Sequence, residues 1–363
     1  MGARLDTTRV VACVQGPVHT AGSGCETAST KMDALSEILR VIKLDSAIYF
    51  NAEFCEPWCL ASPESRTLAP MLAPGAGHVI IYHLLCEGRA FVQLLDGERI
   101  ALAAGDLVTF PHGDGHMLGS GPPVAPIDAA TALPGVLEKG LELLHLGGRG
   151  AVSRFICGFL SCDPQLSHAF LAGLPPLIKI NIRDDPSGQW LENSLRFSVT
   201  QAANREAGAD ATLTKLSEVV FAETLRRYVR GLPEGQTGWL AGARDEEVGK
   251  ALALLHRRHE QRWTVAELAR ETGLSRTVLS ERFRHYLGEP PMAYLTRWRL
   301  RLGARALAST SRSVAQIAAE VGYESEAAFN RAFKREYGLP PARYRKDKAS
   351  QRAATPSVGS VRG

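Results

Sequence analysis

The sequence predicts an α+β chain in which a β jelly roll with flanking helices precedes an all-α domain of two helix-turn-helix units. Short apolar runs separated by turn residues occupy positions 47–159, as in a jelly roll. The last third has helical periodicity with two matched glycine turns. Residues 250–348 carry 20 Lys and Arg against 10 Asp and Glu, whereas the rest carries 22 against 28. A basic module beside a mildly acidic one is typical of proteins that bind duplex DNA.

The most informative stretch runs from Ser313 to Lys346 and predicts helix, tight turn, helix. Its first helix has one apolar face, made by Val314, Ile317, Ala318 and Val321. Gly322 suits the sharp turn, and Ser325 is a good N-cap for the second helix. The second helix places polar and cationic residues on its outer face, as expected of a helix that enters the major groove. A merely solvated charged face is about equally common for one such helix.

A second copy of the pattern, at 263–288, decides between these alternatives. Thr264 and Glu267 predict a capping box, Gly273 the turn and Ser275 the next N-cap. Gly273 and Gly322 lie 49 residues apart, and both copies end in Gly-x-Pro-Pro. Two matched units predict a DNA-binding domain rather than a chance pattern.

On these residues the stretch from Asp245 to Lys346 resembles the DNA-binding domain of AraC/XylS transcription regulators. The most specific match runs from Ile317 to Tyr323, through Phe329–Lys334, to Gly338–Arg345, with Pro340 in place of the usual Ser or Thr. Between the units, residues 292–309 predict one helix of roughly 27 Å, near the ~34 Å of one DNA turn. The predicted DNA-binding residues are Arg276, Thr277, Ser280, Glu281, Arg284, Glu326, Ala327, Asn330, Arg331 and Lys334. Arginine suits guanine, asparagine adenine and glutamate cytosine, whereas lysine suits phosphate.

The N-terminal strands resemble the cupin-type sensor domain of some regulators of this family. Gly105–Pro111 with His116 is similar to the second cupin motif, whereas the first motif is degraded around His83. The resemblance implies a barrel pocket for a small molecule. It also implies a bound metal ion as a possible cofactor. The effector or metal candidates are His83, His112, His116, Cys157 and Cys162. The competing interpretation, which the residue types favour slightly, is that these are satisfied polar groups of the barrel interior.

Seven cysteines, all in the first half, predict no disulfide framework because their number is odd. Buried inert thiols are the commoner case, but an oxidant sensor that uses Cys25 or Cys157 stays open. The pattern predicts these segments: a loose leader at 1–30, the sensor and dimerisation domain at 31–230, a linker at 231–244, the DNA-binding domain at 245–346 and a disordered tail at 347–363. Positions 119–141 predict a flexible excursion, and an apolar stripe at 213–228 predicts domain core or a dimer seam.

The whole pattern predicts a sequence-specific regulator of transcription, an activator by resemblance, that senses a small molecule, a metal or an oxidant. The expected partners are promoter DNA, RNA polymerase and a second copy of the chain. We find no apolar run of membrane length and no secretory h-region, so the expected location is the cytoplasm. The main alternative is a metal-dependent cupin enzyme fused to a DNA-binding module, for which a full metal triad is not evident. A DNA-repair protein is a further alternative, but its cysteine set cannot be assembled here.

Overall fold

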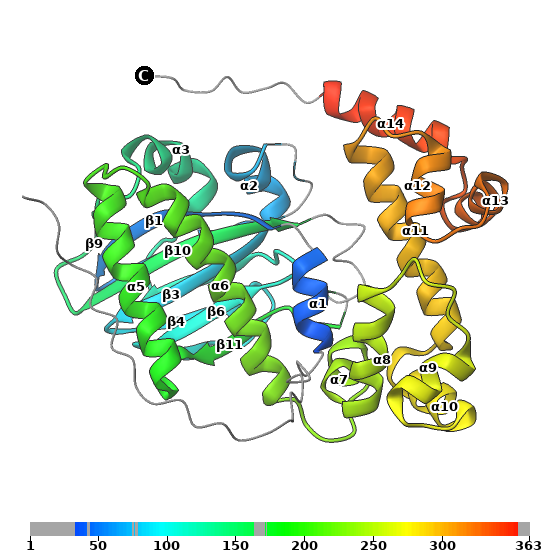
Figure 1. Ribbon diagram of the computed structural model, residues 1–363. Coiled ribbons are helices and arrows are strands. Elements are labelled where there is room, and N and C mark those ends of the chain that lie inside the picture. The colour runs from blue at the N-terminus through cyan, green and yellow to red at the C-terminus, as the bar shows by residue number, and fades with distance from the viewer. Residues whose placement is uncertain are drawn as a thin grey trace, which may run out of the picture. The chain divides into compact units, whose positions relative to one another are not determined.

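The computed structural model describes residues 33–41, 44–74, 76, 79–162, 171 and 173–354. The predicted leader therefore lies outside the described residues, as does Cys25. The N-terminal domain contains two β-sheets with helices packed on them, and the C-terminal domain is helical, as the sequence predicts (Figure 1). None of the described helices has the length and apolar character needed to cross a bilayer.

The larger sheet has the strand order β11-β6-β3-β10-β1-β9. We call it sheet A. Its strands are β1 (Leu44–Cys55), β3 (Ile80–Glu87), β6 (Asp106–Phe110), β9 (Leu144–Gly147), β10 (Val152–Cys162) and β11 (Ile178–Asn181). Neighbouring strands are antiparallel, except that β9 runs parallel to β1. Strands β3 and β10 are almost wholly buried because both faces of sheet A are covered.

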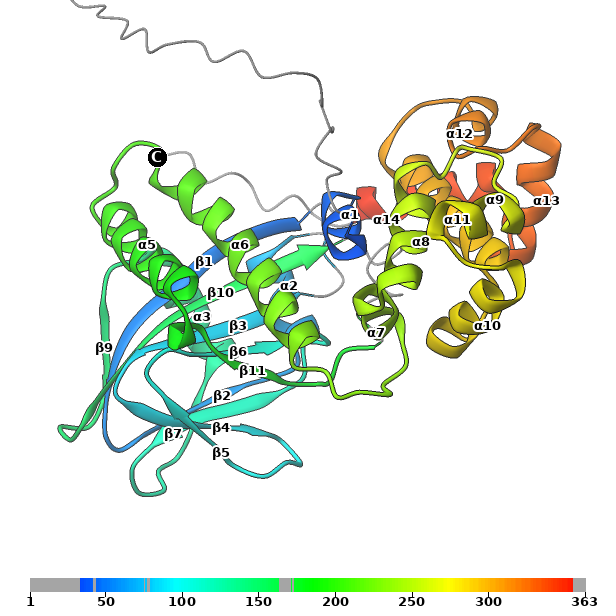
Figure 2. The same cartoon turned by 60° about the horizontal axis from the view of Figure 1, so that its bottom comes forward.

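The smaller sheet, sheet B, has the order β5-β4-β7-β2-β8 and faces the inner side of sheet A (Figure 2). Its strands are β2 (Trp58–Ser62), β4 (Arg89–Leu94), β5 (Ile100–Ala103), β7 (His116–Ser120) and β8 (Ile127–Asp128). A turn that contains Asp96 and Gly97 joins β4 to β5, and the Gly97 amide donates to the Leu94 carbonyl. A core of aromatic and aliphatic side chains fills the space between the sheets.

Helices cover the outer face of sheet A and one end of the barrel. Helices α5 (Pro186–Ala203) and α6 (Ala209–Arg230) lie across sheet A (Figure 1). The stripe of α6 at Leu213, Leu216, Val220 and Leu225 is buried in this core. It therefore belongs to the domain interior and not to a dimer seam. Shorter helices are α1 (Ala34–Val41), α2 (Ser65–Leu72), α3 (Ala129–Lys139) and the 3-10 turn η1 (Ile182–Asp184).

Three sequence expectations differ from the structure. The flexible excursion at 119–141 instead contains β8 and α3, because Asp128 caps the helix by accepting from the Ala130 amide. The linker at 231–244 contains α7 (Trp239–Arg244), whose Trp239 and Leu240 are buried. The prediction of a disordered tail from residue 347 is wrong as far as residue 354, because α14 (Pro341–Ala354) continues to that residue. Residues 355–363 lie outside the described part of the chain.

The helical domain consists of two similar units joined by α11 (Pro291–Ser309), a helix of 19 residues. The first unit contains α8 (Glu246–Arg257), α9 (Val265–Thr272) and α10 (Arg276–Leu287). The second contains α12 (Val314–Glu320), α13 (Glu326–Tyr337) and α14. The predicted caps are confirmed: Thr264 and Glu267 form a capping box, and Ser275 and Ser325 accept from backbone amides of α10 and α13. Both turn glycines have left-handed backbone angles, 78° at Gly273 and 84° at Gly322, which favour glycine.

Candidate DNA interface and effector cavity

Helices α10 and α13 present the predicted DNA-contacting residues on their outer faces. In α10 Leu279 and Phe283 are fully buried, so Arg276, Thr277, Glu281 and Arg284 remain exposed. Ser280 is half-buried, and its hydroxyl donates to the Arg276 carbonyl. The buried side therefore fixes the face of α10 that can approach a base edge.

Helix α13 has the same construction. Phe329 and Phe333 are fully buried and Ala332 is nearly so. Glu326, Ala327, Arg331 and Lys334 are exposed, and Asn330 is half-buried. Carboxamide, guanidinium and ammonium groups thus lie on one side of the helix, which is the chemistry that reads adenine, guanine and phosphate. Each of the two helices carries five of the ten predicted residues.

Two arginines outside this face, Arg299 of α11 and Arg282 of α10, hold parts of the domain together. The Nε and Nη2 of Arg299 donate to the carbonyls of His259 and Gln261, at 2.6 and 2.7 Å. Arg282 forms ion pairs with Asp245 and Glu247 at the start of α8. These side chains position the recognition helices and are less available for phosphate.

Sequence reasoning missed Val278, an exposed apolar side chain of α10. It lies between Thr277 and the buried Leu279, in the N-terminal part of the helix that enters the groove in helix-turn-helix proteins. An apolar group at such a position is suited to the methyl group of thymine. The sequence did contain a signal for its exposure, because Val278 does not share the i, i+4 spacing of the buried Leu279 and Phe283.

The second candidate site is a cavity of about 270 Å³ inside the N-terminal barrel. Strands of both sheets form its walls, and α3 lies along it. Its wall is mainly apolar, with Phe50, Leu133 and Val136 among its residues. The ionisable residues that line it are His83, Cys157 and Lys139. The sequence did not indicate Lys139 as a lining residue. Pro134 and Gly135 disfavour a helix, so the helix that carries Lys139 was not predicted.

His83, His116 and Cys157 come together in the barrel interior, each no more than 2% exposed. His83 and Cys157 are paired across β3 and β10, whereas His116 comes from β7 of sheet B. The Nδ1 of His83 lies 2.7 Å from the Cys157 sulfur, and its Nε2 lies 2.9 Å from the Nε2 of His116. The His116 Nδ1 donates to the Asp114 carbonyl at 2.9 Å. One set of tautomers satisfies all three hydrogen bonds of this series: Cys157 donates to His83, and His83 donates to His116.

Burial favours the neutral forms of these three hydrogen-bonded side chains. Desolvation lowers the pKa of His83 well below its ordinary value, and that of His116 to about 4. Desolvation also raises the pKa of the Cys157 thiol well above its ordinary value. A neutral thiol is a weak nucleophile, so the geometry favours a hydrogen-bonding role for Cys157.

The other two candidates do not join this group. His112 is exposed, and its Nε2 lies 2.9 Å from the Leu174 carbonyl. Cys162 ends β10, and its side chain lies outside the described residues. Within the described part of the chain no group of three or more His, Cys, Asp or Glu side chains could hold a metal ion. The two histidines do not fit a metal centre with Cys157, because the thiol lies at the opposite nitrogen of His83.

Comparisons with known proteins agree with both parts of the chain. A family described as Cupin matches residues 33–230, and one described as Helix-turn-helix domain matches residues 268–347. A putative AraC-like transcription regulator of Streptomyces lividans is 30% identical over 317 residues, which covers 87% of this chain and 98% of that protein. The HTH-type transcriptional regulator AlkR of Acinetobacter baylyi is 30% identical over 316 residues, or 86% and 99% of the two chains.

Among solved structures, the DNA-binding domain of AdpA in complex with a target DNA is 31% identical, with a TM-score of 0.28. The matched region covers 29% of this chain and 96% of the AdpA domain. Since the full-length relatives are named as regulators, the chain is a DNA-binding regulator and not an enzyme. With a cupin-type domain followed by a helix-turn-helix domain, it belongs to the AraC family of transcription regulators.

Proposed function

We propose that this regulator responds to a small, mainly apolar organic molecule that enters the cavity of its cupin-type domain. The observation that carries the proposal is the cavity itself, about 270 Å³ with an apolar wall and the hydrogen-bonded His83–Cys157 pair. Pockets of this composition, apolar with a few placed polar groups, are typical of small-molecule sites. A hydroxyl group of the ligand would donate to the Cys157 sulfur, because both ring nitrogens of His83 already form hydrogen bonds.

The volume sets the size of the effector. An apolar cavity of ~150 Å³ holds benzene, so this one would hold a molecule of about ten non-hydrogen atoms. The effector that we propose is therefore organic, and the proposal includes no metal ion. An oxidant sensor at Cys157 receives less support, because the thiol is buried and its pKa is raised.

A series of n-alkanols from butanol to decanol tests this proposal, with the unfolding temperature and the operator affinity of the full chain as readouts. We expect stabilisation that rises with chain length and stops once the cavity is full. Ala132→Leu, which fills the cavity from α3, should abolish the effect, whereas Glu138→Leu on the exposed side of α3 should not. Equal responses of the two variants, or no dependence on chain length, would contradict the proposal.

We further propose that the regulator acts as a homodimer in the bacterial cytoplasm and activates transcription through RNA polymerase. Membership of the AraC family supports the activator role. The dimer is supported by Trp190 and Phe197 of α5, which are 61% and 64% exposed and lie two helical turns apart. Transcription in vitro with purified polymerase and an operator fragment tests activation: added regulator should increase transcript, and a decrease would show repression instead.

A further inference from the structure

A second cavity, of about 280 Å³, lies on the outer side of sheet A beneath α5. Strands β1, β3 and β10 contribute Asn51, Cys86, Arg154 and Ile156, and α5 contributes Arg196 and Thr200. Successive residues of a strand point to opposite faces of a sheet, so Ile156 faces this cavity while Cys157 faces the barrel interior. The two cavities are therefore separate sites.

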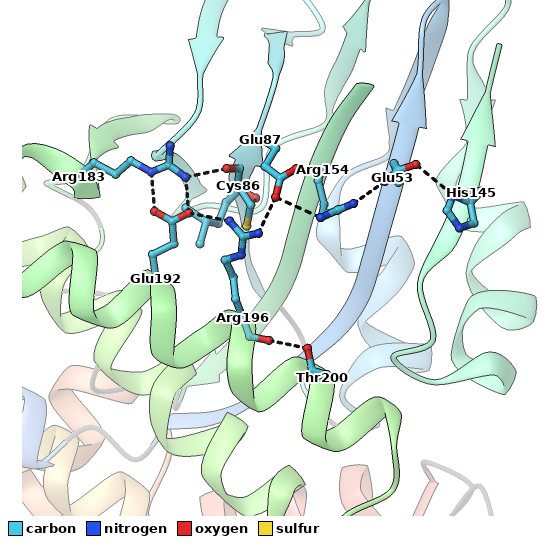
Figure 3. A network of polar contacts seen from close by, with 10 residues as sticks. Glu53, Cys86, Glu87, His145, Arg154, Arg183, Glu192, Arg196 and Thr200 are labelled. Atoms are coloured by element: carbon cyan, nitrogen blue, oxygen red, sulfur yellow. Dashed lines mark hydrogen bonds and ion pairs between the residues drawn. The ribbon is translucent and has the colours of Figure 1, made fainter. Parts of the chain in front are cut away.

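The described residues that line this cavity include two arginines and no acidic residue. The nearby acidic groups, Glu192, Glu87 and Glu53, alternate with arginines in a row of charges (Figure 3). Arg154 donates to Glu53 at 2.6 Å and to Glu87 at 3.1 Å, and Arg196 donates to the same Glu87 oxygen at 2.5 Å. Glu87 thus holds the two guanidinium groups side by side at the cavity.

Both guanidinium groups keep donors available beside these bonds. The Nε of Arg154 is buried and has no hydrogen-bond partner among the described residues. The Nη1 of Arg196 lies 3.8 Å from Glu192, which is an ionic contact but longer than a hydrogen bond. An anion at the cavity wall would therefore be attracted by both guanidinium groups, and the Arg196 Nη1 could donate to it while Nη2 keeps its bond to Glu87.

We propose that this cavity binds a small organic carboxylate with a short apolar body. Carboxylates match the donor geometry of guanidinium groups, and paired arginines favour them over neutral acceptors. The Asn51 amide and the Thr200 hydroxyl add two neutral hydrogen-bonding groups to the wall. Ile156, Val199 and Leu143 provide the apolar surface for the rest of the ligand.

Titration calorimetry of the full-length protein with hexanoate, and with hexanamide as its neutral isostere, tests the proposal. We expect hexanoate to bind at least tenfold more tightly than hexanamide. Arg196→Gln should weaken hexanoate binding at least tenfold. Glu87→Gln should strengthen it, because the glutamate competes for the same two arginines. Ala203→Leu, which fills the cavity from the end of α5 without changing a charge, should weaken it independently.

Two controls separate this site from other effects. Arg183→Gln removes the ion pair to Glu192 but does not line the cavity, so hexanoate binding should stay within twofold. Ala132→Leu fills the barrel cavity and should leave hexanoate binding unchanged. This holds whether or not the barrel cavity binds the apolar effector proposed above. Equal binding of hexanoate and hexanamide, or a loss of affinity in Glu87→Gln as in Arg196→Gln, would overturn the proposal. Equally tight binding of inorganic phosphate would overturn the carboxylate assignment.

Discussion

At the scale of single residues, we expect the side chains on the outer faces of α10 and α13 to determine how the protein binds DNA. Arg331 and Lys334 are both exposed on α13, but their chemistry differs. A guanidinium group can bind guanine through two hydrogen bonds, whereas an ammonium group binds phosphate as a point charge. Replacing each should therefore change a different property of the complex.

Arg331→Ala should weaken operator binding by about 1–3 kcal/mol and relax specificity at one base pair. Lys334→Ala should weaken all sequences alike and reduce the slope of log affinity against log salt by about one. Binding titrations at several salt concentrations measure both effects. Lys215→Ala on α6, an exposed lysine of the cupin-type domain, is the control and should leave both unchanged. Wild-type affinity of both α13 variants at every salt concentration would show that α13 does not enter the groove.

The buried histidines make the stability of the cupin-type domain depend on pH. Burial lowers the pKa of His116 from 6.5 to about 4 in the folded protein. As the pH falls, His116 of the unfolded chain is therefore protonated near pH 6.5, whereas His116 of the folded chain is protonated only near pH 4. The stabilisation is therefore complete above pH 6.5 and is lost as the pH falls towards 4. By pH 5 the loss is about 2 kcal/mol for this group.

His116→Gln should be less stable than the wild type at pH 7, because its hydrogen bonds change, but should lose less stability between pH 7 and pH 5. Unfolding temperatures of the full chain at the two pH values measure this difference. His112→Gln, at an exposed position, should reproduce the wild-type loss. The same loss in His116→Gln as in wild type would show that His116 titrates normally.

At the scale of elements, α11 joins the two units, and its glycine shows how closely the helices approach. A Cβ atom at Gly303 would lie 2.8 Å from the Phe329 ring, which is fully buried. Glycine is unfavourable inside a helix, so its presence here follows from packing against α13 and not from helix propensity.

Gly303→Ala should therefore destabilise the DNA-binding domain by about 1–3 kcal/mol through overpacking. Without the clash the same substitution in a helix would be stabilising by ~0.4–1 kcal/mol. Gly135→Ala in α3, where a Cβ would contact nothing within 4 Å, is the matched control and should be neutral or stabilising. Urea unfolding of both variants measures the two signs, and a stabilised Gly303→Ala would mean that α13 can shift away from α11.

At the scale of the whole molecule, the exposed aromatic residues of α5 bear on oligomeric state. Trp190 and Phe197 lie on the outer side of the helix, whereas Leu191 and Leu195 are buried against the domain. Large apolar groups exposed in this way are typical of interaction surfaces. A second copy of the chain is the occupant that we propose, because two copies of one operator-binding protein double the DNA contacts.

The double change Trp190→Glu with Phe197→Glu should convert the proposed dimer into a monomer, since four like charges would meet at the interface. Sedimentation velocity at micromolar concentration measures the mass. Operator affinity should fall with it, while the unfolding temperature at low concentration stays close to wild type. An unchanged mass of the variant would place the interface elsewhere, and a wild-type monomer would exclude the dimer.

Much of the DNA-binding domain follows from the sequence alone, because the signals there are local. Capping residues, turn glycines and apolar residues at helical spacing act within a few positions of each other, so Thr264, Gly273 and Ser325 predict their structures directly. The register of the buried phenylalanines then determines which residues of α13 are exposed. The jelly roll was predicted as a class, because alternating strands and turns show its architecture but not its strand pairing.

Only the tertiary structure decided the composition of the sites in the cupin-type domain. His83, His116 and Cys157 are separated by tens of residues. Strand pairing places His83 beside Cys157, and the packing of sheet B on sheet A brings His116 to His83. His112 lies outside this group, with its Nε2 at the Leu174 carbonyl, although it is only four positions before His116 in the sequence. The arginine pair of the second cavity depends in turn on the packing of α5 over β10. Strand register and helix packing arise from the burial of the whole core, which no short stretch of sequence specifies.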